Sequence, residues 1–369
     1  MKVLIIEAHS APYRDPAFWK LEHGEHIQIN ILTELQKGNA TTHPEWAYKS
    51  PMEKRRRYVG RPIACSYFIY HKGFISELNQ FKPDAVVISS FIEAILAKCI
   101  CNAHVVWCAD TVKRGRYGRK KWNEYWLKWM YRRADSFWVP GVLSKSYFEQ
   151  YIKGERPIYM GSYTDDCYEQ ARKINEALEI RNTLREELKI PKMSFVFLFV
   201  GKLIPTRRID ILLSVANQAA KDNLMLEFLI IGDGEECNKV QEYIKKHKNV
   251  KWLPSVHRND LEKYYALSDA YVHPGEEPYS LATYEAATAG LPIVASERVG
   301  CVLDCLDNNK NGYIAEFGSV DDFYRKIKDV ADRKLATDNI IKKQNEILEK
   351  RGPNWAADQL KNACMNGKW

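Results

Sequence analysis

The sequence contains no long hydrophobic run. No stretch approaches the roughly 18 apolar residues that a transmembrane helix needs. The apolar run near the start, residues 3–6, ends at Glu7. A run this short is neither a signal peptide nor a membrane span, and it is typical of a buried strand. We therefore expect a cytoplasmic protein.

Internal repeats and low-complexity segments are also absent, and the cysteines form no metal-binding pattern. The nine cysteines are an odd number, and most of them lie within apolar strand or helix patterns. This favours reduced core thiols over a disulfide framework. Cys99 and Cys101 are separated by one residue and have no matching Cys/His pair downstream, so we expect no zinc site.

The overall composition is typical of a folded protein with two domains. The 369 residues exceed one ordinary core, and 46% of them are hydrophobic, which excludes a disordered chain. The chain has 55 Lys and Arg against 47 Asp and Glu, a net charge of +8. This excess suggests an anionic partner, and a nucleotide, a nucleic acid and an acidic lipid all remain open.

Short apolar runs alternate with helical patterns in two series. The first series comprises residues 3–6, 85–89, 104–108 and 136–139, and the second comprises residues 195–200, 226–231, 271–273 and 293–295. Continuous apolar runs are typical of strands that are buried on both faces. We therefore predict an α/β protein with two doubly wound, Rossmann-like domains. Two such domains in tandem would bind ligands in a cleft between them, at the carboxyl ends of their strands.

A polar, charge-rich stretch, residues 171–192, separates the two series. It is helical in pattern and ends at Ile190-Pro191. We therefore predict a first domain over residues 1–185 and a second over 186–350. Residues 351–369 have apolar side chains at helical spacing and form a predicted C-terminal helix.

The strongest chemical signal is the segment Pro274-Gly-Glu-Glu-Pro-Tyr-Ser280 and the helical pattern that follows it. Ser280 is a good N-cap, and Gly290 is a good residue to follow the end of a helix. The free N–H groups at the start of this helix suit a phosphate oxygen. They belong to Leu281, Ala282 and Thr283.

Two carboxylates flank this helix start. Glu277 precedes the helix and Glu285 lies more than one turn inside it, so they can accept hydrogen bonds from different parts of one ligand. The alternative is an exposed acidic loop before an amphipathic helix, with Glu285 facing solvent. The surrounding glycines and prolines, and the small residues that follow Glu285, favour a ligand site.

These residues resemble the Glu-x7-Glu signature of glycosyltransferase family 4. The resemblance extends to residues 197–210, which match the family's strand followed by a glycine and two basic residues. Gly201 matches the glycine, and Lys202 and Arg207 match the basic pair. Family members usually have Arg and then Lys, so the two types are exchanged here, which keeps both charges but changes their geometry. Arg208 is an alternative to Arg207. A third reading has both cations solvated at a helix start.

Weaker matches complete the resemblance, which covers residues 194–314 closely. Gly232 lies in a turn like the family's turn after the next strand, and Val256 lies in a loop like the one against the nucleobase. A Gly-Asp-Gly turn such as Gly232 to Gly234 is by itself as often a plain tight turn.

The resemblance implies a retaining, metal-independent enzyme of the GT-B fold, whose C-terminal helix crosses back to the first domain. It would move a hexose from a nucleoside diphosphate, with uracil expected before guanine, to a hydroxyl of a glycan acceptor. A lipid-linked acceptor is included. Lys202 and Arg207 would bind the diphosphate, Glu285 the ribose and Glu277 the donor sugar. No cofactor and no metal ion is expected, because two cations can stabilise the leaving diphosphate.

The first domain matches the family only in outline. Many members have a Gly-Gly pair after the first strand, where this sequence has Ala8-His-Ser-Ala-Pro-Tyr-Arg-Asp15. His9 and Arg14 in this loop, together with Asp110, are candidates to contact the acceptor. The alternatives are a structural hydrogen-bonding role for His9 and a helix cap for Asp110.

Two basic and aromatic stretches, residues 46–58 and 113–133, distinguish the first domain. In the second, Trp122, Trp126, Trp129 and Met130 fall at helical spacing behind several cations. Such a helix can lie on an anionic membrane, which would suit peripheral binding at the cytoplasmic face. The alternative is an aromatic stripe that faces the core. Nucleic acid is not an expected partner, because no recognition module accompanies these residues.

Two other functions remain open. One is a nucleotide-sugar epimerase of the same fold, which needs no acceptor-binding surface. The other is a membrane or nucleic-acid binding protein that has lost its chemistry. The Glu-x7-Glu match favours transfer over both.

Overall fold

The computed structural model describes residues 1–7, 13–25, 27–34, 50–65, 68–110, 121–164, 166–254 and 256–365, without the side chains of residues 65, 68, 121–124 and 259. The chain forms two compact units. Unit 1 contains Met1–Asp166 and Arg351–Trp369, and unit 2 contains Cys167–Lys350. Within the described ranges, no helix combines the length and the apolar character that a bilayer crossing requires.

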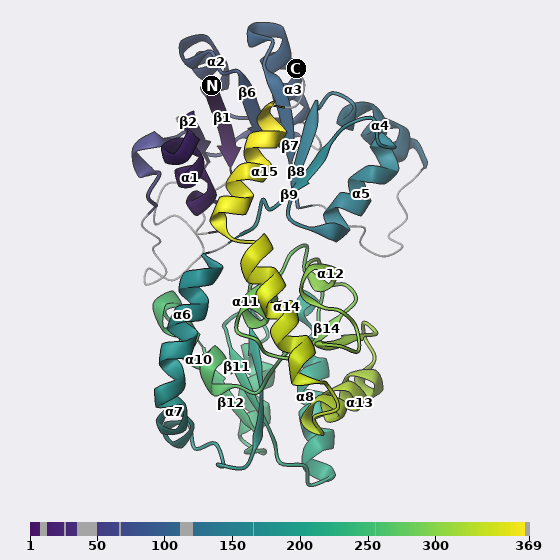
Figure 1. Ribbon diagram of the computed structural model, residues 1–369. Coiled ribbons are helices and arrows are strands. Elements are labelled where there is room, and N and C mark those ends of the chain that lie inside the picture. The colour runs from purple at the N-terminus through teal and green to yellow at the C-terminus, as the bar shows by residue number, and fades with distance from the viewer. Residues whose placement is uncertain are drawn as a thin grey trace. The chain divides into compact units, whose positions relative to one another are not determined.

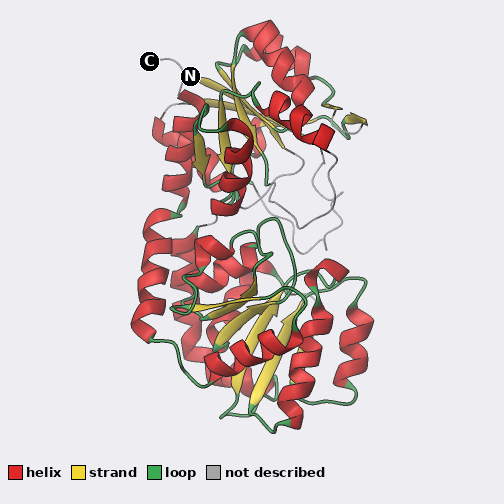
Figure 2. Cartoon of the chain, turned by 90° about the vertical axis from the view of Figure 1, so that its right-hand side faces the viewer, coloured by secondary structure: helices red, strands yellow, loops and turns green. Residues whose placement is uncertain are grey.

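Unit 1 is built on a parallel sheet of seven strands among the described residues, with helices on its faces (Figure 2). Its strands, in sheet order, are β3 (Arg56–Tyr58), β2 (Gln28–Thr33), β1 (Lys2–Glu7), β6 (Ala85–Ile88), β7 (His104–Cys108), β8 (Ser136–Val139) and β9 (Ile158–Met160). A separate antiparallel pair joins β4 (Ile63–Cys65) to β5 (Phe68–Tyr70). Its helices are α1 (Asp15–Glu25), η2 (Glu53–Arg55), α2 (Phe74–Phe81), α3 (Phe91–Cys101), α4 (Lys121–Tyr131), α5 (Val142–Ile152) and α15 (Pro353–Met365).

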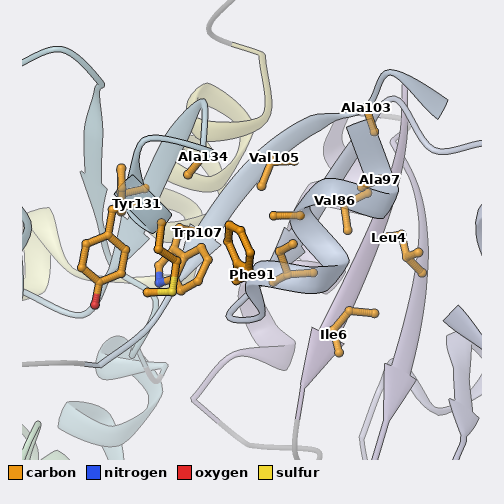
Figure 3. Close-up of a cluster of buried hydrophobic side chains, with 14 of the residues drawn as sticks. Leu4, Ile6, Val86, Phe91, Ala97, Ala103, Val105, Trp107, Tyr131 and Ala134 are labelled. Atoms are coloured by element: carbon orange, nitrogen blue, oxygen red, sulfur yellow. The ribbon is translucent and has the colours of Figure 1, made fainter. Parts of the chain in front are cut away.

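Two layers of apolar side chains cover the faces of this sheet. On one face, residues of α2 to α5 pack on the strands, and Figure 3 shows Phe91, Trp107 and Tyr131 in this cluster. On the other face, Val3, Ile5 and residues of α1 pack with α15. Parallel strands covered on both faces must be apolar throughout, which is why β1 and β6 appear in the sequence as unbroken runs.

Helix α15, the yellow helix at the end of the chain in Figure 1, lies beside α1 and the sheet of unit 1. Leu360 is fully buried. The Ser136 hydroxyl donates a hydrogen bond of 2.6 Å to the Ala363 carbonyl, and Lys361 pairs with Glu25 at 2.6 Å. The last turns of the chain therefore complete the core of unit 1.

Unit 2 has a second parallel sheet, which contains six strands in the described ranges. In sheet order they are β12 (Val250–Leu253), β11 (Leu226–Ile231), β10 (Phe195–Val200), β13 (Ala270–His273), β14 (Ile293–Ser296) and β15 (Gly312–Ala315). Its helices are α6 (Cys167–Ala177), η3 (Leu178–Ile180), α7 (Arg181–Glu187), η4 (Pro205–Arg207), α8 (Ile209–Lys221), α9 (Cys237–Ile244), η5 (Arg258–Asp260), α10 (Leu261–Leu267), α11 (Leu281–Thr288), α12 (Val302–Cys305), α13 (Val320–Ala331) and α14 (Thr337–Lys350).

The units divide after Asp166, whereas the sequence prediction placed the division after residue 185. The difference is the helical stretch of α6 to α7, which belongs to unit 2. Arg181 donates to the Ala266 carbonyl at 2.7 Å, and Arg185 donates to the Leu267 carbonyl and to Asp269, both at 2.7 Å. These bonds satisfy the carboxyl end of α10 and anchor α7 there.

The cysteines differ in part from the prediction of core thiols. Among those described, Cys167, Cys301, Cys305 and Cys364 are buried, but Cys99 is exposed on α3. The core prediction is therefore wrong for Cys99, because an apolar helix that covers a sheet still has one face in water.

Candidate functional site

The loop after β13 leads into the start of α11. Ser280 is extended, and its hydroxyl oxygen accepts a hydrogen bond of 3.3 Å from the Thr283 N–H, so the predicted N-cap and helix are confirmed. The Thr283 N–H is thus occupied by the cap in this structure. The N–H groups of Leu281 and Ala282 lie in the first turn, where an α-helix offers no acceptor of its own. A phosphate oxygen can accept from both.

Glu277 lies in this loop beside Arg207 and His273, and the Ser280 side chain also hydrogen-bonds to its carboxylate. Its Oε1 accepts from Arg207 Nη2 at 2.5 Å, and its Oε2 lies 3.3 Å from His273 Nε2. Burial raises the pKa of the Glu277 carboxyl, but the His273 hydrogen bond and the Arg207 charge outweigh it, and the pKa lies below its ordinary value. Glu277 is therefore an anionic acceptor with hydrogen-bonding capacity to spare.

Glu285 lies one helical turn deeper, and its side chain is only 4% exposed. Tyr265 donates its hydroxyl to Oε2 at 2.8 Å, and Arg258 lies 3.4 Å from Oε1. Burial raises the pKa of the Glu285 carboxyl above its ordinary value, although Arg258 and Tyr265 lower it. The alternative in which Glu285 faces solvent is wrong, because the carboxylate is buried and partnered.

The basic positions follow the neighbouring strand β10. Arg207 donates to the Glu276 carbonyl at 2.6 Å as well as to Glu277. Arg208 instead pairs with Asp210, to which its Nε and Nη2 donate hydrogen bonds of 3.0 and 2.9 Å. Of the two alternatives for the second basic position, Arg207 is therefore the one beside Glu277. Lys202 is exposed, and it forms no ion pair within the described part of the chain.

Two glycines allow the loops to approach one another. A Cβ on Gly275 would lie 2.4 Å from the Arg207 Cα, so only glycine lets the Glu277 loop meet η4. A Cβ on Gly232 would lie 1.8 Å from the Gly201 carbonyl oxygen. The turns after β10 and β11 are thereby pressed together. The Trp252 indole N–H also donates to the Gly232 carbonyl at 2.9 Å.

Val256 follows β12 and is half-buried, and its neighbour at position 255 lies outside the described residues. The loops after β10, β11, β12 and β13 all leave the carboxyl edge of one parallel sheet. This edge is where open α/β sheets bind ligands. The predicted residues of unit 2 therefore share one edge.

In unit 1, Arg14 and Asp110 belong to one cluster. Arg14 donates to the Ser162 carbonyl at 3.3 Å and lies over the Tyr163 ring at 5.0 Å. The Tyr163 hydroxyl in turn donates to Asp110 at 3.2 Å. His9 lies outside the described residues, as do residues 111–120, so the alternative roles of His9 and Asp110 stay predictions.

The first basic stretch is less exposed than its sequence predicts. The Arg56 side chain is fully buried and pairs with Glu7 at 2.8 Å and with Asp15. Arg55 and Arg57, by contrast, are 44% and 55% exposed. Arg56 is therefore a core residue, because two buried carboxylates compensate its charge. Residues 46–49 lie outside the description.

The second stretch divides between core and surface. Leu127 and Met130 of α4 are buried, and Trp129 stacks on Trp126 with ring centroids 5.0 Å apart. Trp129 is 42% exposed and Tyr125 is 79% exposed. Residues 113–120 and the side chain of Trp122 lie outside the described part of the chain. The core alternative thus holds for Met130 but not for Trp129.

Sequence reasoning missed three site residues: His273, Arg258 and Tyr265. His273 precedes Glu277 by four residues at the end of a strand, and this spacing was the available signal. Arg258 and Tyr265 come from a segment that showed the family resemblance without pointing to any role. Their contacts depend on how α10 returns to α11, which spacing along the chain cannot reveal.

Comparison with known proteins gives a partial sequence match. The family described as "Glycosyl transferases group 1" matches residues 180–349, a little under half of the chain. The UDP-Gal:alpha-D-GlcNAc-diphosphoundecaprenol alpha-1,3-galactosyltransferase of Escherichia coli is 32% identical over 177 residues, which cover 46% of this chain and 45% of that protein. The poly(ribitol-phosphate) alpha-N-acetylglucosaminyltransferase of Staphylococcus aureus is 28% identical, over 41% of this chain and 33% of that protein. The chain spans less than half the length of these two relatives.

The fold match extends over the whole chain. The crystal structure of Anabaena HepE in complex with UDP and glucose has a TM-score of 0.70 at 15% identity, covering 99% of this chain and 100% of that chain. The predicted GT-B fold, with a Rossmann-like parallel sheet in each unit, is therefore confirmed.

Proposed function

We propose that this chain, with its GT-B fold and its group 1 glycosyltransferase segment, is a retaining, metal-independent hexosyltransferase of family 4. The observation that supports this most directly is the pairing of Arg207 with Glu277 beside the start of α11, one turn from the buried Glu285. Arg207, Glu277 and Glu285 match, in this order, the diphosphate, the donor sugar and the ribose of a sugar nucleotide.

Each part of the donor has a partner in this proposal. Lys202, Arg207 and the N–H groups of Leu281 and Ala282 bind the diphosphate. Glu285 accepts the ribose hydroxyls, and the backbone near Val256 contacts the base. Glu277 accepts hydroxyls of the donor sugar. We expect a UDP-sugar rather than a GDP-sugar as the donor, because the name of the E. coli relative gives a UDP-sugar donor.

The reaction exchanges one bond at the anomeric carbon. The bond to the leaving phosphate oxygen breaks, and the acceptor hydroxyl oxygen forms the new bond on the same face of the sugar. The hydroxyl proton passes to the leaving diphosphate. Cations preorganised at this diphosphate stabilise the charge that develops on it, and no metal ion is needed for that role.

The acceptor is a glycan, and a lipid-linked glycan suits the GlcNAc-diphosphoundecaprenol acceptor in the name of the E. coli relative. In unit 1, Arg14 and Asp110 are the described candidates to contact it, and His9 is a third. This assignment is separate from the donor site, because it depends on other loops.

The decisive test is nucleotide release by the purified protein. Offered UDP-galactose, UDP-glucose, UDP-N-acetylglucosamine or GDP-mannose with a membrane extract, the protein should release nucleotide from one donor and label a glycan. Interconversion of the sugar nucleotide without transfer would favour the epimerase instead. Absence of turnover with every donor would favour the non-catalytic binding protein.

A matched pair of variants tests the basic position. Arg207→Ala should lower transfer by about tenfold or more, because it removes a charge-assisted contact of roughly 1.5–3 kcal/mol. Arg208→Ala removes the same charge from the next residue, which faces Asp210, and it should change transfer by less than about threefold. Equal losses in both variants would contradict the assignment.

A membrane surface on α4 is a separate part of the proposal. Trp129 and Tyr125 are exposed, and the Arg133 guanidinium lies 4.5 Å over the Trp129 ring. Cationic and aromatic groups of this kind bind the interface of an anionic membrane. The protein should float with anionic liposomes at low salt and lose this binding in Tyr125→Ser/Trp129→Ser. The control is Tyr168→Ser, at an exposed tyrosine of unit 2. Flotation that is the same in both variants would contradict the proposal.

A further inference from the structure

His273, the last residue of β13, contacts the Glu277 carboxylate. The side chain is only 1% exposed, and its ring lies 5.9 Å from the ring of Phe199. Nε2 lies 3.3 Å from Glu277 Oε2. Nδ1 is buried and has no hydrogen-bond partner among the described residues. Within the described part of the chain, the imidazole therefore has one polar contact, and this contact is with Glu277.

The contacts of the ring determine which nitrogen bears the proton. A carboxylate can only accept, so the nitrogen that faces Glu277 must donate, and Nε2 bears the proton. A proton on Nδ1 would be buried without an acceptor, which is costly. His273 is thus placed to donate a single hydrogen bond, and only to Glu277.

Arg207 donates to the other carboxylate oxygen of Glu277, but in the proposed function it also binds the diphosphate. When a diphosphate is bound, the Arg207 guanidinium must also serve the phosphate oxygens, and its hold on Glu277 weakens. Among the described residues, His273 has no competing partner. Together with the Ser280 hydroxyl, which also hydrogen-bonds to this carboxylate, it therefore keeps Glu277 in place when the sugar nucleotide is bound.

The backbone around Glu277 makes this contact specific. The Gly300 N–H donates to the Glu277 carbonyl at 2.8 Å, and the Glu277 N–H donates to the Arg298 carbonyl at 3.3 Å. With its backbone fixed, the carboxylate can still rotate about its side-chain bonds. The contact with His273 removes that freedom and leaves the remaining lone pairs directed to a ligand.

We propose that His273 is a positioning residue for recognition of the donor sugar: its Nε2–H orients Glu277 so that the carboxylate accepts hydroxyls of the hexose. The proposal rests on the proposed function. It predicts that His273 affects affinity for the sugar and the rate of transfer, but not affinity for the nucleotide, because Glu277 contacts neither the phosphates nor the base.

Three variants separate positioning from packing. His273→Gln retains an N–H at about the reach of Nε2. His273→Asn is also polar and smaller, but its amide ends too short to reach Glu277. His273→Leu fills the space without a donor. If the leucine variant does not fold, the Gln and Asn pair provides the comparison.

The measurements are the Kd for UDP, the Kd for the UDP-sugar that the wild type turns over, and kcat. The Kd for UDP should stay within about twofold in all variants. In His273→Asn and His273→Leu, the gain in affinity from the sugar and kcat should both fall by about tenfold, the size of one charge-assisted hydrogen bond. His273→Gln should recover most of this loss.

Three outcomes overturn the proposal. Wild-type values in His273→Leu or His273→Asn would show that Glu277 needs no orientation by His273. An equal loss of UDP affinity in all three variants would show a purely structural role. A wild-type protein that binds UDP but turns over none of the sugar nucleotides would contradict the proposed function and this proposal with it, whereas normal wild-type turnover with unaffected variants contradicts only the role of His273.

Discussion

Glu277 and Glu285 have the same side chain but opposite electrostatic surroundings. The donors around Glu277 lower the pKa of its carboxyl, while burial raises the pKa of Glu285. Glu277 is therefore ready to accept hydrogen bonds without a ligand. The charge on Glu285 is costly in the free protein, and in the proposed function two ribose hydroxyls would relieve this cost.

Replacement of Glu285 should separate stability from binding. Because its pKa is raised on folding, protonated Glu285 favours the folded state, and this contribution is lost as pH rises through the folded pKa. At neutral pH, Glu285→Gln should therefore raise the melting temperature of the free protein and weaken UDP binding by about tenfold. The gain in stability should shrink toward pH 4, where wild-type Glu285 is itself protonated.

Calorimetric melts between pH 4 and 8, with titration of UDP into both proteins, provide this test. Tyr265 can still donate to the glutamine oxygen, and Arg258 is 39% exposed and stays hydrated. A variant that is less stable than the wild type at neutral pH would contradict the proposed cost of the buried charge.

At the scale of single elements, the cap of α11 should affect both stability and the proposed binding of phosphate. Ser280→Ala removes the acceptor of the Thr283 N–H, and it should lower the free energy of unfolding by about 0.5–2 kcal/mol. It should also weaken UDP binding, because the first turn of α11 becomes less ordered.

Ser319 caps α13 in the same unit by the same geometry, accepting from the Asp322 N–H at 3.2 Å. Ser319→Ala is therefore a matched control that should lose similar stability and keep its UDP affinity. Urea unfolding and UDP titration of both variants give the comparison. Equal UDP affinities in the two variants would contradict the proposal that the start of α11 binds phosphate.

The central strands were predictable from sequence and several outer ones were not. The predicted runs at residues 104–108, 136–139, 195–200 and 226–231 coincide with β7, β8, β10 and β11. Strand β3 begins with Arg56, whose burial depends on Glu7 and Asp15 from other elements. Strand β2 contains Asn30, whose side-chain amide donates a hydrogen bond to Glu77 of α2. Polar residues in these strands conceal the pattern, because their partners are distant in sequence.

The candidate site was predictable to a similar degree. Glu277, Ser280 and Glu285 follow from local signals, namely a cap, a glycine and a carboxylate spacing. The contact between His273 and Glu277 requires the loop to fold back over its own strand, which depends on the close approach of Gly275 to Arg207. A loop that folds back in this way produces no periodic pattern in the sequence.

At the scale of the whole molecule, the core of each unit should respond separately to mutation. Leu360→Ala opens a cavity between α15 and the sheet of unit 1, and it should cost about 2–5 kcal/mol. Leu212 of α8 is equally buried, but in the core of unit 2. Leu212→Ala is therefore the matched variant for the other unit.

Hydrogen exchange of the two variants checks this prediction. Leu360→Ala should weaken protection in β1, β6 and β8 and spare β10 and β11, and Leu212→Ala should do the reverse. Loss of protection in both units from either variant would show that they unfold together.

The connection of α15 to unit 1 also sets an order of events on the ribosome. Unit 2 is one continuous segment, Cys167–Lys350, whereas unit 1 needs Arg351–Trp369 from after it. During synthesis, unit 2 is complete in sequence while the face formed by Val3, Ile5 and Phe18 still lacks Leu360 and Ala363. The domain that starts first in the chain therefore finishes folding last. Until then, its unfinished apolar face is a surface for chaperones.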